Sequence, residues 1–324
     1  MDVAVAQDEG KNAIPLDHFY VERKGAGGLR KILKNFTFGA STGYGNTFFS
    51  HKLDGFGVYQ APGGSPQIFS GSTATRYGNW VNDVSIDKSA ASGSAFIANP
   101  GSADLGFKGN ALNIPLQLFL YYGFKERYRI GGGYSYELMS IGTMHPTALS
   151  DKIGNFQPAS PTGFIRKYYG MVGYAFYRRD EYLFTGDLQV GSWKPKGNFN
   201  AEVTGGTYFN LGVTIERDLS EYFKLFVRPS FEFKSYSLAI PESNKSIDHS
   251  VNAFYINIGA TYRIPELRRC FLKDCHAQIN HAHGNREYRS RKHPIYKKQN
   301  PGYGENDKTL IKYKGKNKKK LNPY

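Results

Sequence analysis

The chain of 324 residues has only two cysteines, and it contains no apolar run near the roughly 18–20 residues that a membrane-spanning helix needs. Two cysteines are too few for a disulfide-rich scaffold. A complete signal peptide is also missing, although the small residues at 4–7 (AVAQ) resemble the end of a cleavage site, which permits an exported protein. Aromatic residues, at 15%, and 37 glycines are abundant instead, a composition typical of an all-β protein with many aromatic strands.

Residues 113–124 (NIPLQLFLYYGF) show the pattern on which the fold class depends. Every second residue from Ile114 to Tyr122 is apolar or aromatic, and Gln117 lies on the opposite parity. A period of two residues is that of a β-strand with one apolar face. A soluble sandwich would bury this face in its own core, whereas an outer-membrane barrel would turn it toward lipid. The arrangement of the other strands distinguishes the two.

The same alternation predicts eight antiparallel strands, separated alternately by short and long connections. The strands are expected at 34–43, 111–124, 127–140, 165–177, 182–193, 207–217, 222–237 and 251–264. Three connections are short charged turns, and the four others span 44–110, 141–164, 194–206 and 238–250. Outer-membrane barrels alternate short periplasmic turns with longer outer loops in this way.

Aromatic residues near the predicted strand ends also favour a membrane barrel. Trp193 borders a long loop, and the short turns are bordered by Tyr128, Tyr177, Tyr182, Tyr222 and Tyr262. The segment 34–264 resembles the outer-membrane β-barrel superfamily in its small, eight-stranded form, by architecture and without a diagnostic motif. Pro115 and Pro229 lie in mid-strand and remove ladder donors, so we expect a bulge or a shifted boundary there. An extra hairpin around residues 47–60 would raise the count to ten.

The polar parity of the strands carries charges of both signs. An eight-stranded barrel has an interior just wide enough for side chains, and charges enclosed there must pair because an unpaired buried charge is very costly. We expect an ion-paired plug made of Arg129, Glu137, Asp187, Glu216, Lys224, Arg228, Glu232, Lys234 and Arg263. The barrel is therefore predicted to be an anchor that conducts nothing and needs no cofactor.

A change of composition divides the chain at residue 265. Residues 1–33 form an N-terminal segment without a predicted element, 34–264 form the barrel, and 265–324 form a tail with sixteen Lys and Arg against five Asp and Glu, +11 of the net +15. Eight strands place both chain ends in the periplasm, beside the short turns. The tail cannot bury its own core, and we expect it to dock onto a protein through Tyr296, Lys297, Lys298, Tyr303, Tyr313 and Tyr324.

The beginning of the tail contains a C-x4-C-H-x4-H-x-H pattern that leaves two interpretations open. In an oxidising periplasm, Cys270 and Cys275 form a local disulfide most simply. Alternatively, thiolates and imidazoles at this spacing are suitable zinc ligands, and the metal set is then Cys270, Cys275, His276, His281 and His283.

The sequence thus predicts a non-enzymatic outer-membrane barrel, in contact with lipid, that anchors or assists an envelope assembly of the secretion or outer-membrane biogenesis type. Nucleic acid is not expected, because the barrel places the tail in the wrong compartment. One alternative is a surface-binding or adhesin-like barrel that uses loops 44–110 and 141–164, and another is a soluble β-sandwich with a nucleic-acid-binding tail. A third is a rim enzyme built on His145 or His249, although no serine nucleophile motif lies near them.

Overall fold

The computed structural model describes most of the barrel segment and part of the tail. The described residues are 28–70, 76–87, 93–125, 127–179, 182–197, 199, 203–220, 222–272, 281–283 and 286–289. Within them no helix has the length and apolar character required to cross a membrane. A short helix, α2 (Gly28–Leu33), lies in the N-terminal segment for which no element was predicted, and Lys34 just after it pairs with Glu266 at 2.9 Å.

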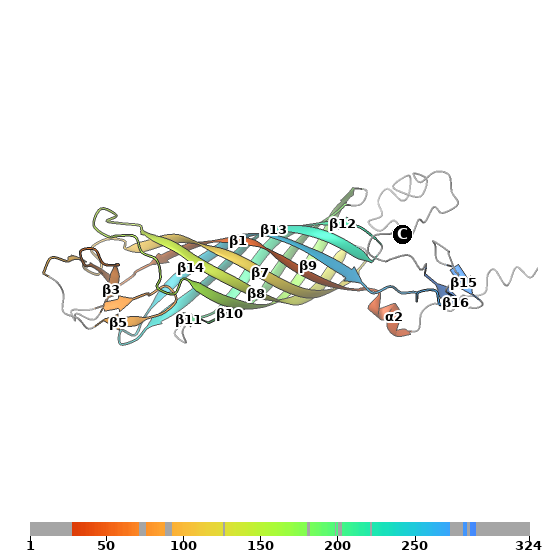
Figure 1. Cartoon of the computed structure of the whole chain (residues 1–324), viewed down its shortest axis with the longest axis horizontal. Helices are drawn as coiled ribbons and strands as arrows, with labels where there is room; N and C mark the ends of the chain where they lie inside the picture. Colours follow the sequence, from red (N-terminus) through yellow and green to blue (C-terminus); the bar gives the residue numbers. More distant parts are fainter. Residues whose placement is uncertain are drawn as a thin grey trace, which may run out of the picture.

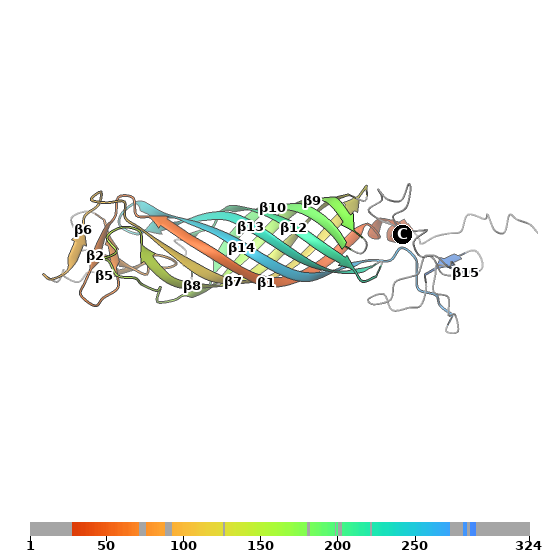
Figure 2. The ribbon, with the colours of Figure 1, turned by 90° about the horizontal axis from the view of Figure 1, so that it is seen from above.

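Eight long antiparallel strands close into a ring (Figures 1 and 2). They are β1 (Phe36–Lys52), β7 (Gly106–Phe124), β8 (Tyr128–Pro146), β9 (Thr162–Arg179), β10 (Tyr182–Lys196), β12 (Thr207–Asp218), β13 (Phe223–Ile240) and β14 (Lys245–Arg263). Each pairs with its neighbour in this order, and β14 pairs with β1 to close the ring, while the short β11 (Val203–Thr204) adds to β13. The chain is an eight-stranded antiparallel barrel, as predicted.

The outward faces of the strands form a continuous apolar surface, here called the lipid belt. It covers alternate residues of 38–48 on β1, 112–120 on β7 and 254–262 on β14, and Leu116 and Leu118 are each 57% exposed. Nine to eleven residues are the length that a tilted strand needs to cross a bilayer. Soluble monomers rarely expose apolar patches of more than a few hundred Å². The apolar face of NIPLQLFLYYGF therefore faces lipid, and the barrel is of the outer-membrane kind.

The barrel has two different ends, here called the loop end and the tail end. At the loop end, the connection between β1 and β7 forms a separate sheet in the order β5-β4-β3-β2-β6 (Figure 1). Its strands are β2 (Gly57–Gln60), β3 (Gln67–Phe69), β4 (Arg76–Gly78), β5 (Ser85–Asp87) and β6 (Phe96–Ala98). The ten-strand alternative is wrong, because β2 pairs with β3 and β6 instead of joining the barrel wall.

Several strands extend further toward the loop end than predicted. β1 continues to Lys52, and β13 and β14 meet in a tight hairpin at which Ile240 faces Lys245. The predicted long connection 238–250 is wrong, and the strict alternation of short and long connections fails there. The sequence analysis missed this part of β14 because its outward-facing residues, such as Ser246 and Ser250, are polar. Its inward-facing residues Ile247 and Val251 are buried.

Both mid-strand prolines are accommodated without a bulge. Next to Pro115, the pairing of β1 with β7 passes from Thr42–Leu116 to Gly45–Asn113 in unchanged register. Next to Pro229, the pairing of β12 with β13 passes from Gly212–Ser230 to Ile215–Val227, again in register. Each proline lacks the N–H that would bond to the neighbouring strand, so the hydrogen bonds between the two strands are interrupted at that point. The residue pairs on either side keep the same register, and the expected bulge is therefore wrong at both sites.

Four of the five tyrosines predicted for the aromatic girdle are exposed, Tyr222 is half-buried, and the predicted tryptophan is buried. Tyr128, Tyr177 and Tyr182 are each between 42% and 50% exposed near the tail end. Trp193 is 2% exposed, because its parity on β10 directs it into the barrel, where it packs edge-on against Tyr236 at 5.8 Å. Trp193 was predicted to lie in the girdle because it is near a strand end. Its side chain instead points into the barrel, because it has the inward parity of β10.

Candidate functional site: the barrel interior and its two ends

Inward-facing glycines create space for the charged side chains of the lumen. A Cβ atom on Gly173 would lie 2.7 Å from Nε of Arg129, and one on Gly212 would lie 2.8 Å from Cζ of Arg228. Contacts of this length do not occur, so any larger residue would displace the guanidinium groups. Small residues on β9 and β12 thus allow long arginines from β8 and β13 to reach across a narrow barrel.

The cluster nearer the tail end is built on two arginines that share Asp187. Arg129 bonds Glu216 at 2.7 Å and Asp187 at 3.1 Å. Arg228 donates from Nε to the other oxygen of Asp187 at 2.7 Å and from Nη2 to Asn210 at 2.6 Å. All four charged groups are buried. Charge-assisted bonds of this kind offset the high cost of desolvating the ions.

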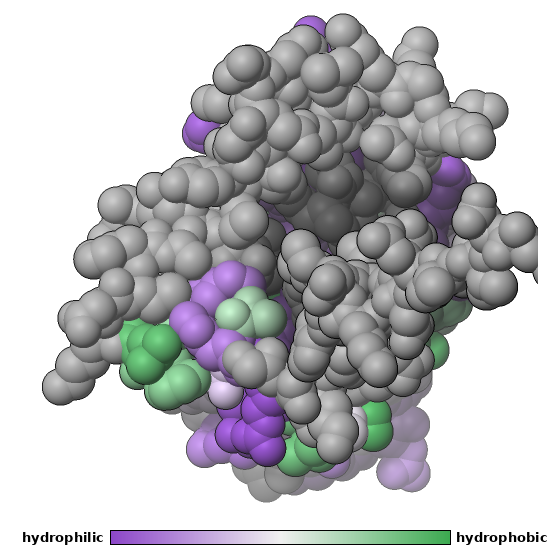
Figure 3. All heavy atoms as spheres, turned by 90° about the vertical axis from the view of Figure 1, so that its right-hand side faces the viewer, coloured by the Kyte–Doolittle hydropathy of each residue, from purple (hydrophilic) through white to green (hydrophobic). Residues whose placement is uncertain are grey.

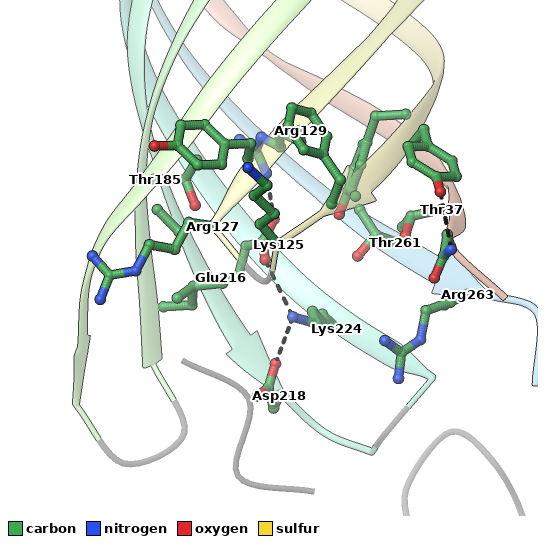
Figure 4. Close-up of a pocket in the computed structure, with 18 of the residues that line it drawn as sticks. Thr37, Lys125, Arg127, Arg129, Thr185, Glu216, Asp218, Lys224, Thr261 and Arg263 are labelled. Carbon is green, nitrogen blue, oxygen red and sulfur yellow. Dashed lines mark hydrogen bonds and ion pairs between the residues drawn. The ribbon is translucent and has the colours of Figure 1, made fainter. Parts of the chain in front are cut away.

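Lys224 extends this cluster into a mouth that opens at the tail end. Its Nζ lies 3.1 Å from Asp218 and 3.4 Å from Glu216 (Figure 4). Asp218 also pairs with Arg178. A cavity of about 430 Å³ begins here, at the end of the molecule that faces the viewer in Figure 3. Arg263 lines this mouth.

The central cluster contains two lysines and two glutamates. Lys167 lies 2.6 Å from both Glu137 and Glu232, and Lys234 lies 2.8 Å from Glu232. Tyr255 donates its hydroxyl to Glu137 at 2.6 Å. Since the four charges cancel, this cluster holds strands β8, β9 and β13 together without a net charge in the lumen.

Eight of the nine residues predicted for the lumen lie in the two clusters. Arg263 lines the mouth instead, beyond the two clusters. Sequence reasoning missed Lys167, Arg178 and Asp218. Lys167 could have been found from its parity, because it alternates with the buried Tyr169 and Met171 on β9. Nothing in the strand pattern reveals that it joins Glu137 to Glu232 across the lumen.

The loop end is closed by a layer of buried aromatic and histidine side chains. Nδ1 of His51 lies 2.9 Å from Nδ1 of His249, which requires one ring to donate and the other to accept. Trp80, from the connection between β1 and β7, packs edge-on against His51 at 4.9 Å, and Tyr236 stacks on His249 at 4.4 Å. Sequence analysis placed His249 in an outer loop, but it is fully buried on β14. His145 lies on β8 and is exposed.

The histidine pair predicts that acid opens the loop end. Both rings lie beyond the lipid belt, and burial lowers the pKa of His51 to about 3 and the pKa of His249 well below its usual value. In an opened loop end both histidines would be exposed and would bind protons below about pH 6.5, whereas in the closed form they stay neutral. The free energy that favours the closed form therefore falls by about 2 kcal/mol per histidine at pH 5. Hydrogen exchange of residues 76–87 should therefore accelerate between pH 7.5 and pH 5, after correction for the intrinsic rate.

Two variants test the origin of this response. The double substitution His51→Gln and His249→Gln should make exchange of 76–87 nearly independent of pH. His145→Gln, which removes an exposed histidine at the same end, should leave the response unchanged. A response that persists in the double variant would show that other groups close the loop end.

Beyond the barrel, the tail forms a small hairpin at the tail end (Figure 1). It consists of β15 (His281–His283) and β16 (Arg286–Tyr288), and the guanidinium of Arg289 lies 5.5 Å from the ring of Tyr222 at the barrel rim. Cys270, His281 and His283 lie close together. Cys275 and His276 lie outside the described residues, as do Tyr296, Lys297, Lys298, Tyr303, Tyr313 and Tyr324.

Comparisons with known proteins return membrane barrels. No protein-family model and no curated protein sequence matches the chain. Solved structures that resemble it include the outer membrane protease OmpT of Escherichia coli, at 14% identity over 72% of this chain and 97% of that one, with a TM-score of 0.34. The outer membrane protein OprG of Pseudomonas aeruginosa follows at 9% identity, 70% and 96% coverage and a TM-score of 0.34. AlkL, an outer membrane protein studied in lipid bilayers, has 10% identity, 73% and 93% coverage and a TM-score of 0.35. Since these scores are below 0.5, the assignment rests on the closed ring and the lipid belt.

Proposed function

We propose that this chain is a non-enzymatic anchor or accessory subunit of an envelope assembly, of the secretion or outer-membrane biogenesis type. The filled lumen is the observation that carries the proposal. Two ion-paired clusters occupy its middle, and buried aromatic residues close its loop end. A barrel filled in this way serves to hold a position in the membrane, and its partners bind at its ends.

The two ends suggest how the protein is oriented. The long connections 53–105 and 147–161 lie at the loop end, as outer loops do in outer-membrane barrels, while α2 and the tail hairpin lie at the opposite end (Figure 2). We infer that the tail end is periplasmic. The tail segment 265–324 would then be available to a periplasmic or outer-membrane protein.

The composition of the tail supports docking onto an acidic protein surface. Residues 290–324 contain eleven of the tail's sixteen Lys and Arg, and tyrosines at 296, 303, 313 and 324 are spaced among them. Tyrosine and arginine are enriched at the energetically important centres of interfaces, and lysine charges steer association with an acidic partner. A segment of this kind would fold on binding.

The proposal is tested by extracting three forms of the protein from membranes in mild detergent and identifying the proteins that copurify. The forms are the full chain, a chain ending at Arg289 and a chain ending at Ile264. A defined set of envelope proteins should be lost in both truncations, since both lack 290–324. Retention of the full set by the chain ending at Ile264 would contradict docking through the tail. Loss after deletion of 55–103 alone would instead support a surface-binding barrel.

Point variants in the full chain distinguish the contribution of the tail's tyrosines to partner binding from the contribution of its lysine charges. Replacing Tyr296, Tyr303 and Tyr313 by serine keeps every charge and should reduce partner recovery at least about tenfold. Replacing Lys297 and Lys298 by glutamine is the matched change, which should slow capture at low salt and have little effect at high salt. Equal sensitivity of both variants to salt would indicate a purely electrostatic contact.

A further inference from the structure

Three metal-ligating side chains converge in the segment that follows the last barrel strand. His281 and His283 occupy alternate positions on β15, so their side chains project from the same face of the strand. Their ring centroids lie 4.8 Å apart. The hairpin that holds them pairs His281 with Tyr288 and His283 with Arg286. Two imidazoles on one face of a hairpin are a partial ligand set.

The backbone brings a cysteine to the same place. The amide of Cys270 donates to the carbonyl of Arg289 at 3.2 Å, and the amide of Arg289 donates to the carbonyl of Arg268 at 2.9 Å. The side chain of Cys270 is buried, and its Sγ lies 3.3 Å from Nε2 of His283. Cys270 and His283 are thirteen positions apart in the sequence, so chain pairing and not local geometry produces this contact.

The distances are close to those of a tetrahedral zinc ion. A thiolate about 2.3 Å and imidazole nitrogens about 2.0–2.1 Å from zinc lie roughly 3.3–3.6 Å from one another. The ligand atoms of Cys270, His281 and His283 all lie within 4.8 Å of one another, and the contact of Cys270 with His283 is at 3.3 Å. A small rotation of one imidazole would complete the arrangement.

We propose that Cys270, His281 and His283 bind a zinc ion that holds the tail hairpin against the preceding segment. A hairpin with three-residue strands is not stable by itself, and the ion would strengthen the link between its strands and Cys270. Phe271 packs against His283 at 5.8 Å and against Tyr288 at 5.4 Å, which shields one side of the site. Binding converts the thiol to a thiolate and releases one proton. Among the described residues three supply ligands, which leaves a fourth position for water or for a group of a docked partner.

Cobalt titration of the full chain in detergent, reduced and free of metal, tests the site. One equivalent of Co²⁺ should bind with a sulfur-to-metal charge-transfer absorption, and Zn²⁺ should displace it. Cys270→Ser should abolish this absorption. Loss of an outer-shell partner weakens metal binding by about 10–100-fold, so His281→Gln and His283→Gln, which remove ligands, should weaken it by at least about 100-fold. Heat-modifiable migration on gels verifies that each barrel is folded.

Two matched variants separate this site from the alternatives. Cys275→Ser should keep the charge-transfer absorption, because the three ligands remain. His145→Gln, at the opposite end of the molecule, should bind as the unaltered chain does. The proposal is overturned if cobalt does not bind stoichiometrically, or if Cys275→Ser removes the absorption while Cys270→Ser keeps it. It is also overturned if Cys270 and Cys275 form a disulfide in the presence of equimolar zinc.

Discussion

Replacing Lys167 by alanine is expected to lower the free energy of unfolding by about 3–5 kcal/mol, the usual cost of removing one partner of a buried ion pair. Lys167 is 3% exposed and lies between Glu137 and Glu232 at 2.6 Å from each. Its loss leaves two buried carboxylates with only Lys234 to offset them. Urea unfolding in detergent micelles, monitored by tryptophan fluorescence and by heat-modifiable migration, measures the change.

The matched control is Lys108→Ala, which removes an exposed lysine from β7 and should change stability by no more than about 0.5 kcal/mol. A compensating variant tests the charge argument itself. Lys167→Met combined with Glu232→Gln removes one charge of each sign and should be more stable than Lys167→Met alone. If the double variant is the less stable one, shape and not charge balance accounts for the effect of Lys167.

Placing an arginine in the middle of the lipid belt is the second change with a large expected effect. Leu116→Arg should lower the stability of the barrel in lipid vesicles by about 2–4 kcal/mol, because a cation at the bilayer midplane is poorly solvated. Leu116 is 57% exposed and lies at the centre of the belt on β7. Reversible folding into vesicles at increasing urea concentrations measures the difference.

Asn110→Arg provides the comparison, since residue 110 lies on the same face of β7 beyond the end of the belt. The same charge near the interface should cost only about 0–1 kcal/mol. A soluble sandwich predicts the opposite behaviour: both variants would fold without detergent, and Leu116→Arg would be tolerated as a surface change. That result would refute the membrane barrel.

The central ion pairs and the lipid belt are two consequences of one alternation. Odd-numbered residues of β7 face the lumen and even-numbered residues face the membrane, so Asn113 reaches Glu137 while Leu112 and Ile114 are exposed. A shift of one residue in register would exchange the two faces along the whole strand. The barrel is thus specified strongly, because a slipped register would bury leucines against charges and expose charges to lipid.

At the loop end, the hydropathy pattern of the sequence stops before the strands themselves do. The segment 245–251 alternates as a strand, yet its outward residues are Ser246, Asp248 and Ser250, which also suit a loop. Above the lipid belt nothing requires the outward face to be apolar, so the hydropathy signal ends before the strand does. The strand continues because its inward residues Ile247, His249 and Val251 pack inside the barrel.

The sequence by itself determined the number of barrel strands, their antiparallel order, the face directed to lipid and eight of the residues in the lumen clusters, because a side chain's face depends only on parity along its own strand. Tertiary structure decided which charges meet, since Lys167 lies on β9 while its partners come from β8 and β13. It also decided that His51 meets His249 and that Cys270 meets His283. These contacts join residues whose distance depends on closure of the ring and pairing of distant segments, and no local period encodes that distance.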